Sequence, residues 1–221
     1  MTPVDTYRWG RARLLEHATS DSAGLPVPAC PGWRVRDVVA HVTGIAADFL
    51  SGRLPAGDVS AWTAEQVASR RDAAFADVVS EWEDQAPRFE AAMAGHLSGG
   101  APRFAADVVS HSFDVAAAVG VAAGRTAPAV EAALATFVDM LGSRLDPAGG
   151  GRVEVRTGGR VLGAGRDGPL AVLTAEPFEA LRVLSGRRTG QEIRRLDWQG
   201  DLDAVIDRIS PFPLPASTLG E

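Results

Sequence analysis

Hydrophobic residues recur at the spacing of an α-helix through the first two-thirds of the chain. From Val35 onward an apolar residue returns every three or four positions, and the stretch 103–119 repeats this pattern. This period is typical of a helix that turns one face toward a core. The pattern predicts helical segments over 2–20, 35–49, 61–97, 103–119 and 127–145. We therefore expect a bundle of four or five helices.

A different pattern begins after the glycine-rich run PAGGG at 147–151. The segment VEVRT alternates apolar and polar residues, and the pair Gly158-Gly159 that follows it is typical of a hairpin turn. The later elements are predicted as strands over 153–157, 161–162, 170–173 and 193–198, with helices over 176–185 and 201–209. The predicted fold is therefore α + α/β.

The expected domains are a helical bundle over 1–146 and a small α/β domain over 152–221, with the boundary near 146–151. The sequence thus separates a mainly helical part from a mixed part at its most glycine-rich segment.

Composition and charge then narrow the class of protein. The formal charge is −6 and the scattered basic residues are all arginine, which argues against a nucleic-acid partner. No apolar run resembles a signal peptide or reaches transmembrane length, so we expect no membrane association. The single cysteine fits a reducing compartment. We expect a cytoplasmic protein, either a monomer or a homodimer.

Candidate chemistry first appears in DVVSHSFD at 107–114. Asp107 and His111 lie roughly 40° apart around the helix axis, on the side that also carries Phe104 and Val108. An inward carboxylate is costly unless it is paired, neutralised or bound to a metal. One explanation is a metal site. The alternative is a buried Asp–His or Asp–Arg pair that only stabilises the bundle.

The earlier segment DVVAH at 37–41 resembles DVVSH and adds a second histidine. His41 lies roughly 40° beyond Ile45, at the edge of the apolar face, whereas Asp37 lies toward the opposite side. The pair of segments therefore predicts one metal held asymmetrically by His41, Asp107 and His111. Two imidazoles and one carboxylate, with one position open, are a common ligand set for a catalytic divalent metal.

Two other motifs are given structural roles. Cys30 lies between prolines, with no helix N-terminus or basic neighbour close in sequence to activate it, so we expect it to pack. It would lie on the order of 15 Å from His41 if its loop continued the helix axis. The run GAGRDG at 163–168 fits a dinucleotide fingerprint by its letters. Pro169 and a strand-like run follow it instead of a helix, so we interpret it as a loop between strands.

The segment CPGWRVRDVVAH at 30–41 resembles the one that bears the first metal histidine in the mycothiol-dependent maleylpyruvate isomerase family, within the DinB-like bundles. The family's later Glu-x-x-x-His, followed by an Asp and a Gly, is matched here by Asp107, His111, Asp114 and Gly120. Asp107 departs from the pattern, because the family usually has Glu there.

The C-terminal part also resembles this family. The stretch AVLTAEPFEALRVLSGRR at 171–188 is similar to the helix and Gly-Arg segment of its small α/β domain, which is itself similar to sterol-carrier proteins. The resemblance therefore implies a DinB-like bundle followed by a sterol-carrier-like α/β domain.

The resemblance implies an enzyme that uses a divalent metal, zinc or alternatively nickel, with mycothiol as the thiol cosubstrate. The thiol would add to a small-molecule electrophile, either in a cis–trans isomerisation or in an S-transfer. The sequence assigns no substrate-binding or catalytic residues beyond the metal ligands His41, Asp107 and His111. Two alternatives stay open: a non-enzymatic bundle that binds a small molecule or a partner, and a metal hydrolase that uses bound water.

Overall fold

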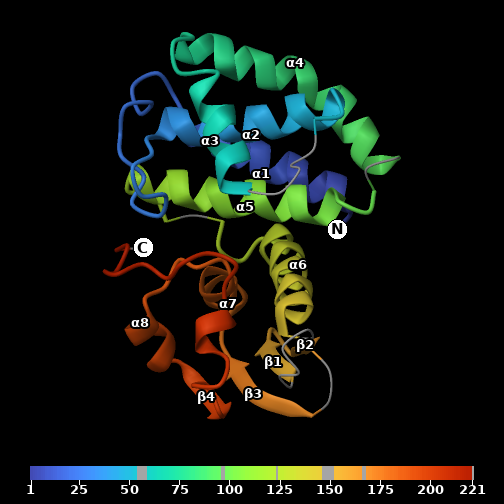
Figure 1. Cartoon of the computed structure of the whole chain (residues 1–221), viewed down its shortest axis with the longest axis vertical. Helices are drawn as coiled ribbons and strands as arrows, with labels where there is room; N and C mark the ends of the chain where they lie inside the picture. The colour runs from blue at the N-terminus through green and yellow to red at the C-terminus, as the bar shows by residue number, and fades with distance from the viewer. Residues whose placement is uncertain (54–58, 96–97, 123, 146–151, 166–167, 221) are drawn as a thin grey trace. The chain divides into compact units, whose positions relative to one another are not determined.

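The structure is a computed structural model that describes the chain except residues 54–58, 96–97, 123, 146–151, 166–167 and 221 (Figure 1). The chain divides into two compact units, Thr2–Val121 and Ala122–Glu221, with Met1 grouped with the second. Among the described residues, no helix is both long and apolar enough to cross a membrane.

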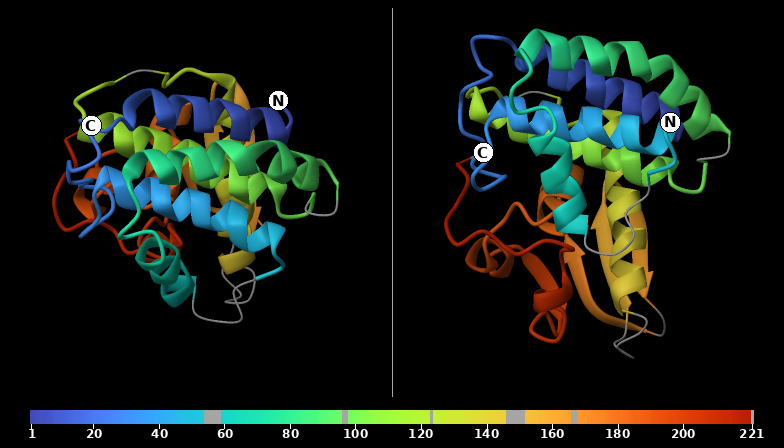
Figure 2. Two further views of the ribbon diagram at one scale, coloured as in Figure 1. Left: turned by 90° about the horizontal axis from the view of Figure 1, so that it is seen from above. Right: turned by 45° about the horizontal axis from the view of Figure 1, so that its top comes forward.

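The N-terminal unit is a helical bundle. Its helices are α1 (Pro3–His17), α2 (Val35–Leu50), α3 (Val59–Ala68), α4 (Phe75–Ala94) and α5 (Ala101–Ala118). Helix α1 packs against α5, and α2 packs against α3 and α4, so that four long helices lie side by side (Figure 2). Large apolar side chains fill the interior, and the buried Trp82 indole donates to the Tyr7 hydroxyl at 2.8 Å.

The region predicted as one helical segment over 61–97 is two helices, α3 and α4. The residues between them, SRRDAA at 69–74, are polar except for two alanines, and Arg70 Nε donates to Glu81 Oε2 at 2.9 Å, which ties the turn to α4. The sequence therefore located the helical residues. It could not show that the chain reverses there, because the break contains neither proline nor glycine.

The C-terminal unit contains a four-stranded sheet in the order β2-β1-β3-β4. Its elements are α6 (Pro128–Leu145), β1 (Arg152–Thr157), β2 (Arg160–Gly165), β3 (Pro169–Thr174), α7 (Pro177–Leu184), α8 (Gly190–Arg194) and β4 (Asp197–Gly200). Strand β1 is antiparallel to β2 and parallel to β3, while β3 is antiparallel to β4. Gly158 and Gly159 both adopt positive φ, as the predicted hairpin requires. The predicted mixed fold is thus confirmed.

The helix α6 does not belong to the bundle, where the sequence analysis placed it. The helix packs against β2 and α7, and its buried residues include Leu134 and Phe137. The first unit already ends at Val121. The expected boundary at 146–151 lies outside the described residues. A periodic apolar face shows that a helix is buried, but it does not identify the surface that buries it.

Two further expectations in the second unit need correction, and a third is confirmed except for where its loop begins. The predicted strand over 193–198 begins as the helix α8, because Thr189 and Glu192 form a capping box that starts a helix at Gly190. The predicted helix over 201–209 is reduced to a 3₁₀ turn at Ile206–Arg208. The expected loop GAGRDG begins inside β2, and β3 follows it, so the helix required for dinucleotide binding is not there.

Candidate metal centre

Two helices of the bundle bring together the three side chains that the sequence singled out. His41 comes from α2, and Asp107 and His111 lie one turn apart on α5. His41 Nε2 lies 3.6 Å from Asp107 Oδ2, and His111 Nε2 lies 3.6 Å from Asp107 Oδ1. One ligand atom from each residue lies within 4.8 Å of the others. The helical phase inferred from the sequence therefore placed these side chains correctly.

These separations suit a small metal ion. Around a tetrahedral ion with ligand bonds of about 2.0–2.2 Å, neighbouring ligand atoms lie about 3.3–3.6 Å apart. The two nitrogen–oxygen distances of 3.6 Å are of this size, and each involves a different oxygen of the Asp107 carboxylate. The two imidazoles and the carboxylate are therefore close enough together to hold one divalent metal ion.

The histidine rings lie under an aromatic side chain from the loop that precedes α2. The half-buried Trp33 ring has its centroid 5.3 Å from that of His41 and 6.3 Å from that of His111, onto which it stacks. The two imidazoles contact each other edge to face, with centroids 5.4 Å apart. The loop thus restricts the access of water to this side of the centre.

His111 is held through its second ring nitrogen by a buried carboxylate. Its Nδ1 lies 3.0 Å from Asp114 Oδ2, and Asp114 is fully buried. Burial lowers the pKa of His111, but the Asp107 and Asp114 carboxylates, together with the Cys30 sulfur, act more strongly, so that its pKa is raised to about 10. The metal-free ring is therefore protonated near neutral pH. The negative surroundings that hold this proton also favour a metal cation in its place.

His41 has a different partner on its second nitrogen. Its Nδ1 lies 2.8 Å from Gln66 Oε1, and the Gln66 amide donates to Asp48 Oδ2 at 2.9 Å. The sequence analysis missed both residues. Asp48 gave a usable signal, because it lies seven residues after His41 and hence only about 20° away on the same helix face. Gln66 gave none, since only the packing of α3 on α2 brings it to His41.

The expectation for Cys30 was wrong in one respect. Its loop does not continue the axis of α2 but folds back, with Val27 N–H donating to the Trp33 carbonyl and Trp33 N–H to the Cys30 carbonyl. Cys30 Sγ consequently lies 3.8 Å from His111 Nδ1 and 3.7 Å from Asp114 Oδ2. The sequence could not predict this contact, because a loop has no repeating pattern from which the direction of its side chains can be calculated.

Cys30, His111 and Asp114 form a second group whose ligand atoms lie within 4.8 Å of one another. This group uses the Nδ1 edge of His111, whereas Asp107 faces Nε2. The two groups therefore lie on opposite edges of the same ring. The Nε2 group includes the second histidine and matches the ligand set expected from the sequence.

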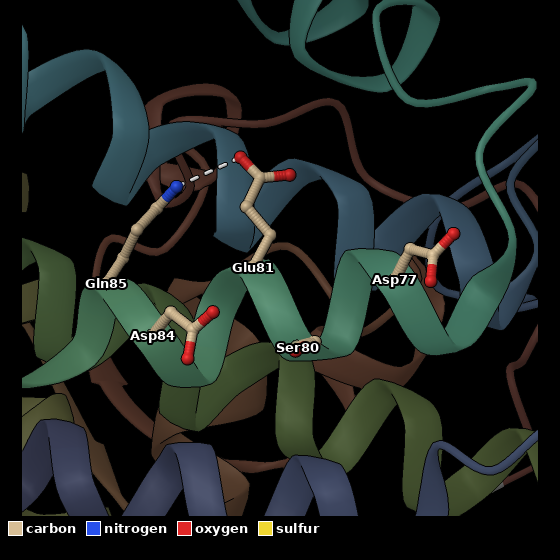
Figure 3. Close-up of a pocket in the computed structure, with 5 residues that line it drawn as sticks. All are labelled: Asp77, Ser80, Glu81, Asp84 and Gln85. Carbon is tan, nitrogen blue, oxygen red and sulfur yellow. Dashed lines mark hydrogen bonds between the residues drawn. The ribbon is translucent and has the colours of Figure 1, made fainter.

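A separate acidic hollow lies along one face of α4. Its lining residues are Asp77, Ser80, Glu81, Asp84 and Gln85 (Figure 3). Gln85 Nε2 donates to Glu81 Oε1 at 2.9 Å, and Glu81 also pairs with Arg70. The hollow contributes no residue to the histidine centre.

The chain therefore combines a helical bundle, in which two histidines and a carboxylate come together, with a small mixed α/β unit. Residues 8–100 match the family described as the mycothiol maleylpyruvate isomerase N-terminal domain. The N-terminal part of the chain therefore carries a domain of this family, and the resemblance seen in its motifs is confirmed over these residues. No protein among those with curated descriptions matches the sequence significantly.

Solved structures share the fold over most of the chain. The crystal structure of the mycothiol-dependent maleylpyruvate isomerase superposes with a TM-score of 0.60 at 16% identity, covering 84% of this chain and 88% of that chain. A mutant of that isomerase, with one histidine replaced by alanine, gives a TM-score of 0.59 at 14% identity and covers 83% and 88%. At this level of identity the similarity establishes the fold.

Proposed function

We propose that the protein is a cytoplasmic, metal-dependent enzyme that uses mycothiol to add a thiol to an electrophilic small molecule. The reaction is a cis–trans isomerisation of the maleylpyruvate type or an S-transfer. His41, Asp107 and His111 hold the metal, for which zinc is the first candidate and nickel the second. The family and the shared fold support this general chemistry.

The observation that carries the proposal is the convergence of three ligand side chains on one point between α2 and α5. A bundle that kept these residues only for packing has no need of two histidines and a carboxylate gathered within 4.8 Å of one another. Three protein ligands also leave a fourth position open, which is the arrangement found in catalytic rather than structural sites.

A divalent metal at this position supplies a Lewis acid that lowers the pKa of a bound thiol or water. The chain's own residues prepare the site for it. Asp114 accepts the Nδ1 proton of His111 and so turns Nε2 of that ring toward Asp107. Trp33 packs on both imidazoles and so limits their movement, while the Asp107 carboxylate stays partly exposed and open to a cation.

The thiol is expected to come from mycothiol and not from Cys30. Cys30 lies on the Nδ1 edge of His111, where Asp114 already accepts a hydrogen bond, and Asp107 lies beyond the other nitrogen. Cys30 therefore lies on the opposite edge of the His111 ring from the other two proposed ligands, and its thiol does not face the proposed open metal position.

The test is metal analysis of the purified protein, followed by turnover of maleylpyruvate and a panel of other electrophiles with and without mycothiol. We expect one divalent metal per chain and turnover that requires both metal and thiol. Metal-dependent turnover without mycothiol would support the hydrolase alternative. Absence of metal binding, even after incubation with zinc or nickel, would leave the non-enzymatic bundle.

A further inference from the structure

A chain of buried polar groups leads from His41 away from the metal centre. His41 Nδ1 contacts Gln66 Oε1 at 2.8 Å, and Gln66 Nε2 donates to Asp48 Oδ2 at 2.9 Å. At its outer end, Arg53 donates to Asp48 Oδ1 from Nε at 2.9 Å and from Nη2 at 2.7 Å. Gln66 is 3% exposed and Asp48 7% exposed. The hydrogen bonds between His41, Gln66 and Asp48 are therefore shielded from exchange with water.

The Asp48 carboxylate, paired with Arg53, determines the direction of the hydrogen bonds from Gln66 to His41. A carboxylate only accepts, so Gln66 must turn its amide nitrogen to Asp48 and its carbonyl oxygen to His41. A carbonyl oxygen also only accepts, so the proton of the neutral His41 ring must be on Nδ1. The lone pair of that ring is then on Nε2, the atom 3.6 Å from Asp107.

Backbone packing holds Gln66 in place for this contact. Gly44 lies on α2, three residues after His41, and a Cβ atom there would come within 2.6 Å of Gln66 Cβ and 2.7 Å of Gln66 Cγ. Glycine at this position therefore allows α3 to approach α2 closely enough for the Gln66 amide to reach the imidazole. A larger residue would push Gln66 away without touching any of the three ligands.

We propose that Gln66, Asp48 and Arg53 are positioning residues that keep the His41 proton on Nδ1 and so present Nε2 as a metal ligand. This proposal rests on the proposed metal function. It gives the two histidines different supports: His111 is held directly by the Asp114 carboxylate, whereas His41 is held by a neutral amide whose orientation Asp48 and Arg53 determine. Partners of this kind commonly set the tautomer and the affinity of ligand histidines.

The variant Asp48→Asn reverses the direction of the hydrogen bonds that link residue 48, Gln66 and His41, while the side chain at position 48 keeps its shape. Arg53 only donates, so it retains the side-chain oxygen of the new amide, and the amide nitrogen then faces Gln66. Gln66 must then accept this hydrogen bond with its side-chain oxygen, so its amide nitrogen faces His41. Nδ1 becomes an acceptor and the proton moves to Nε2, the ligand atom. Adding Arg53→Met frees the amide to turn its oxygen to Gln66, so the double variant should regain the original order.

The first measurement is nitrogen NMR of the neutral His41 ring in the metal-free protein. We expect the proton on Nδ1 in the wild type, on Nε2 in Asp48→Asn, and on Nδ1 again in Asp48→Asn/Arg53→Met. Asp84→Asn, the same chemical change at an exposed position on α4, should leave the wild-type tautomer. A wild-type ring protonated on Nε2 overturns the proposal, and this result does not depend on whether any variant folds.

The second measurement is the zinc affinity of the same proteins, determined by competition with a coloured chelator, with thermal unfolding as the check on folding. We expect Asp48→Asn to bind zinc about 10–100-fold more weakly than the wild type, and the double variant to recover most of that loss. Unchanged affinity in Asp48→Asn with an unchanged tautomer overturns the proposal. If the tautomers follow the prediction but the wild type binds no metal, the positioning chain stands and the proposed function fails.

Discussion

Residues 37–41 and 107–111 carry nearly the same letters, DVVAH and DVVSH, on α2 and α5. Their histidines approach the same carboxylate from two helices, at 3.6 Å each. Their aspartates do different things. Asp107 lies between the histidines, whereas the Asp37 carboxylate accepts the backbone N–H of Arg34 at 2.8 Å. The same spacing therefore places an aspartate at the candidate metal centre in one helix and at the helix start in the other.

The position of each aspartate along its helix explains the difference. Asp37 is the third residue of α2, where backbone N–H groups have no partner within the helix and a carboxylate is favoured. Asp107 lies in the middle of α5, where the backbone groups already bond to one another. Its carboxylate can only find partners among side chains, and the phase of the helix turns it toward the two histidines.

Removing each aspartate in turn tests most directly whether Asp107 and Asp37 have different roles. Asp107→Ala should lower metal affinity by more than about 100-fold, because a ligand is lost and not only a supporting contact. Asp37→Ala should retain the metal but cost about 1 kcal/mol of unfolding free energy, because a helix-start contact is lost. Metal analysis and denaturant unfolding measure both effects. Equal metal loss in the two variants would contradict the assignment of Asp107 as the ligand.

The second prediction concerns the pH dependence of the metal-free protein. The pKa of His111 is raised to about 10 in the folded state, against an ordinary value of about 6.5. Its protonated ring therefore contributes stability that is fully present below pH about 6.5 and is lost as the pH rises toward 10. Thermal unfolding of the metal-free protein across this range should show a falling midpoint. The metal-bound protein should show a smaller decrease, because the metal replaces the proton.

Asp114→Asn should produce a smaller effect than the loss of a ligand. The amide oxygen can still accept the Nδ1 proton of His111, but the charge that strengthens this bond is removed. We expect zinc affinity to fall by about tenfold. The pH range over which the metal-free protein loses stability should also become narrower. An unchanged pH profile in this variant would mean that Asp114 does not contribute to the raised pKa of His111.

The smallest effect is expected from Cys30→Ser, which tests whether the Nδ1 edge of His111 takes part in the chemistry. Zinc affinity should stay within about threefold of the wild type, below the range expected for loss of a supporting contact. Mycothiol-dependent turnover should also persist. Turnover that survives without mycothiol and disappears in Cys30→Ser would make Cys30 the nucleophile, and its position 3.8 Å from His111 Nδ1 would then explain its activation.

The sequence by itself determined most of the secondary structure and the identity of the candidate ligands. Apolar periodicity located the helices of the bundle, and glycine pairs and alternation located the β1–β2 hairpin. The same periodicity put Asp107 and His111 on one inner face and His41 at the edge of another. These inferences succeeded because the angle between residues of one helix is fixed by its geometry and needs no knowledge of the rest of the fold.

Only the tertiary structure decided which surfaces and side chains meet. The apolar face of α6 gave no sign that it packs against β2 and α7, since burial by a sheet or by a helical bundle looks the same in sequence. The loop that brings Cys30 to His111 has no repeating pattern, and the contact of Gln66 with His41 depends on the space that Gly44 leaves between α2 and α3. Periodicity reports that a face is buried, whereas the partner of that face is determined by long-range packing.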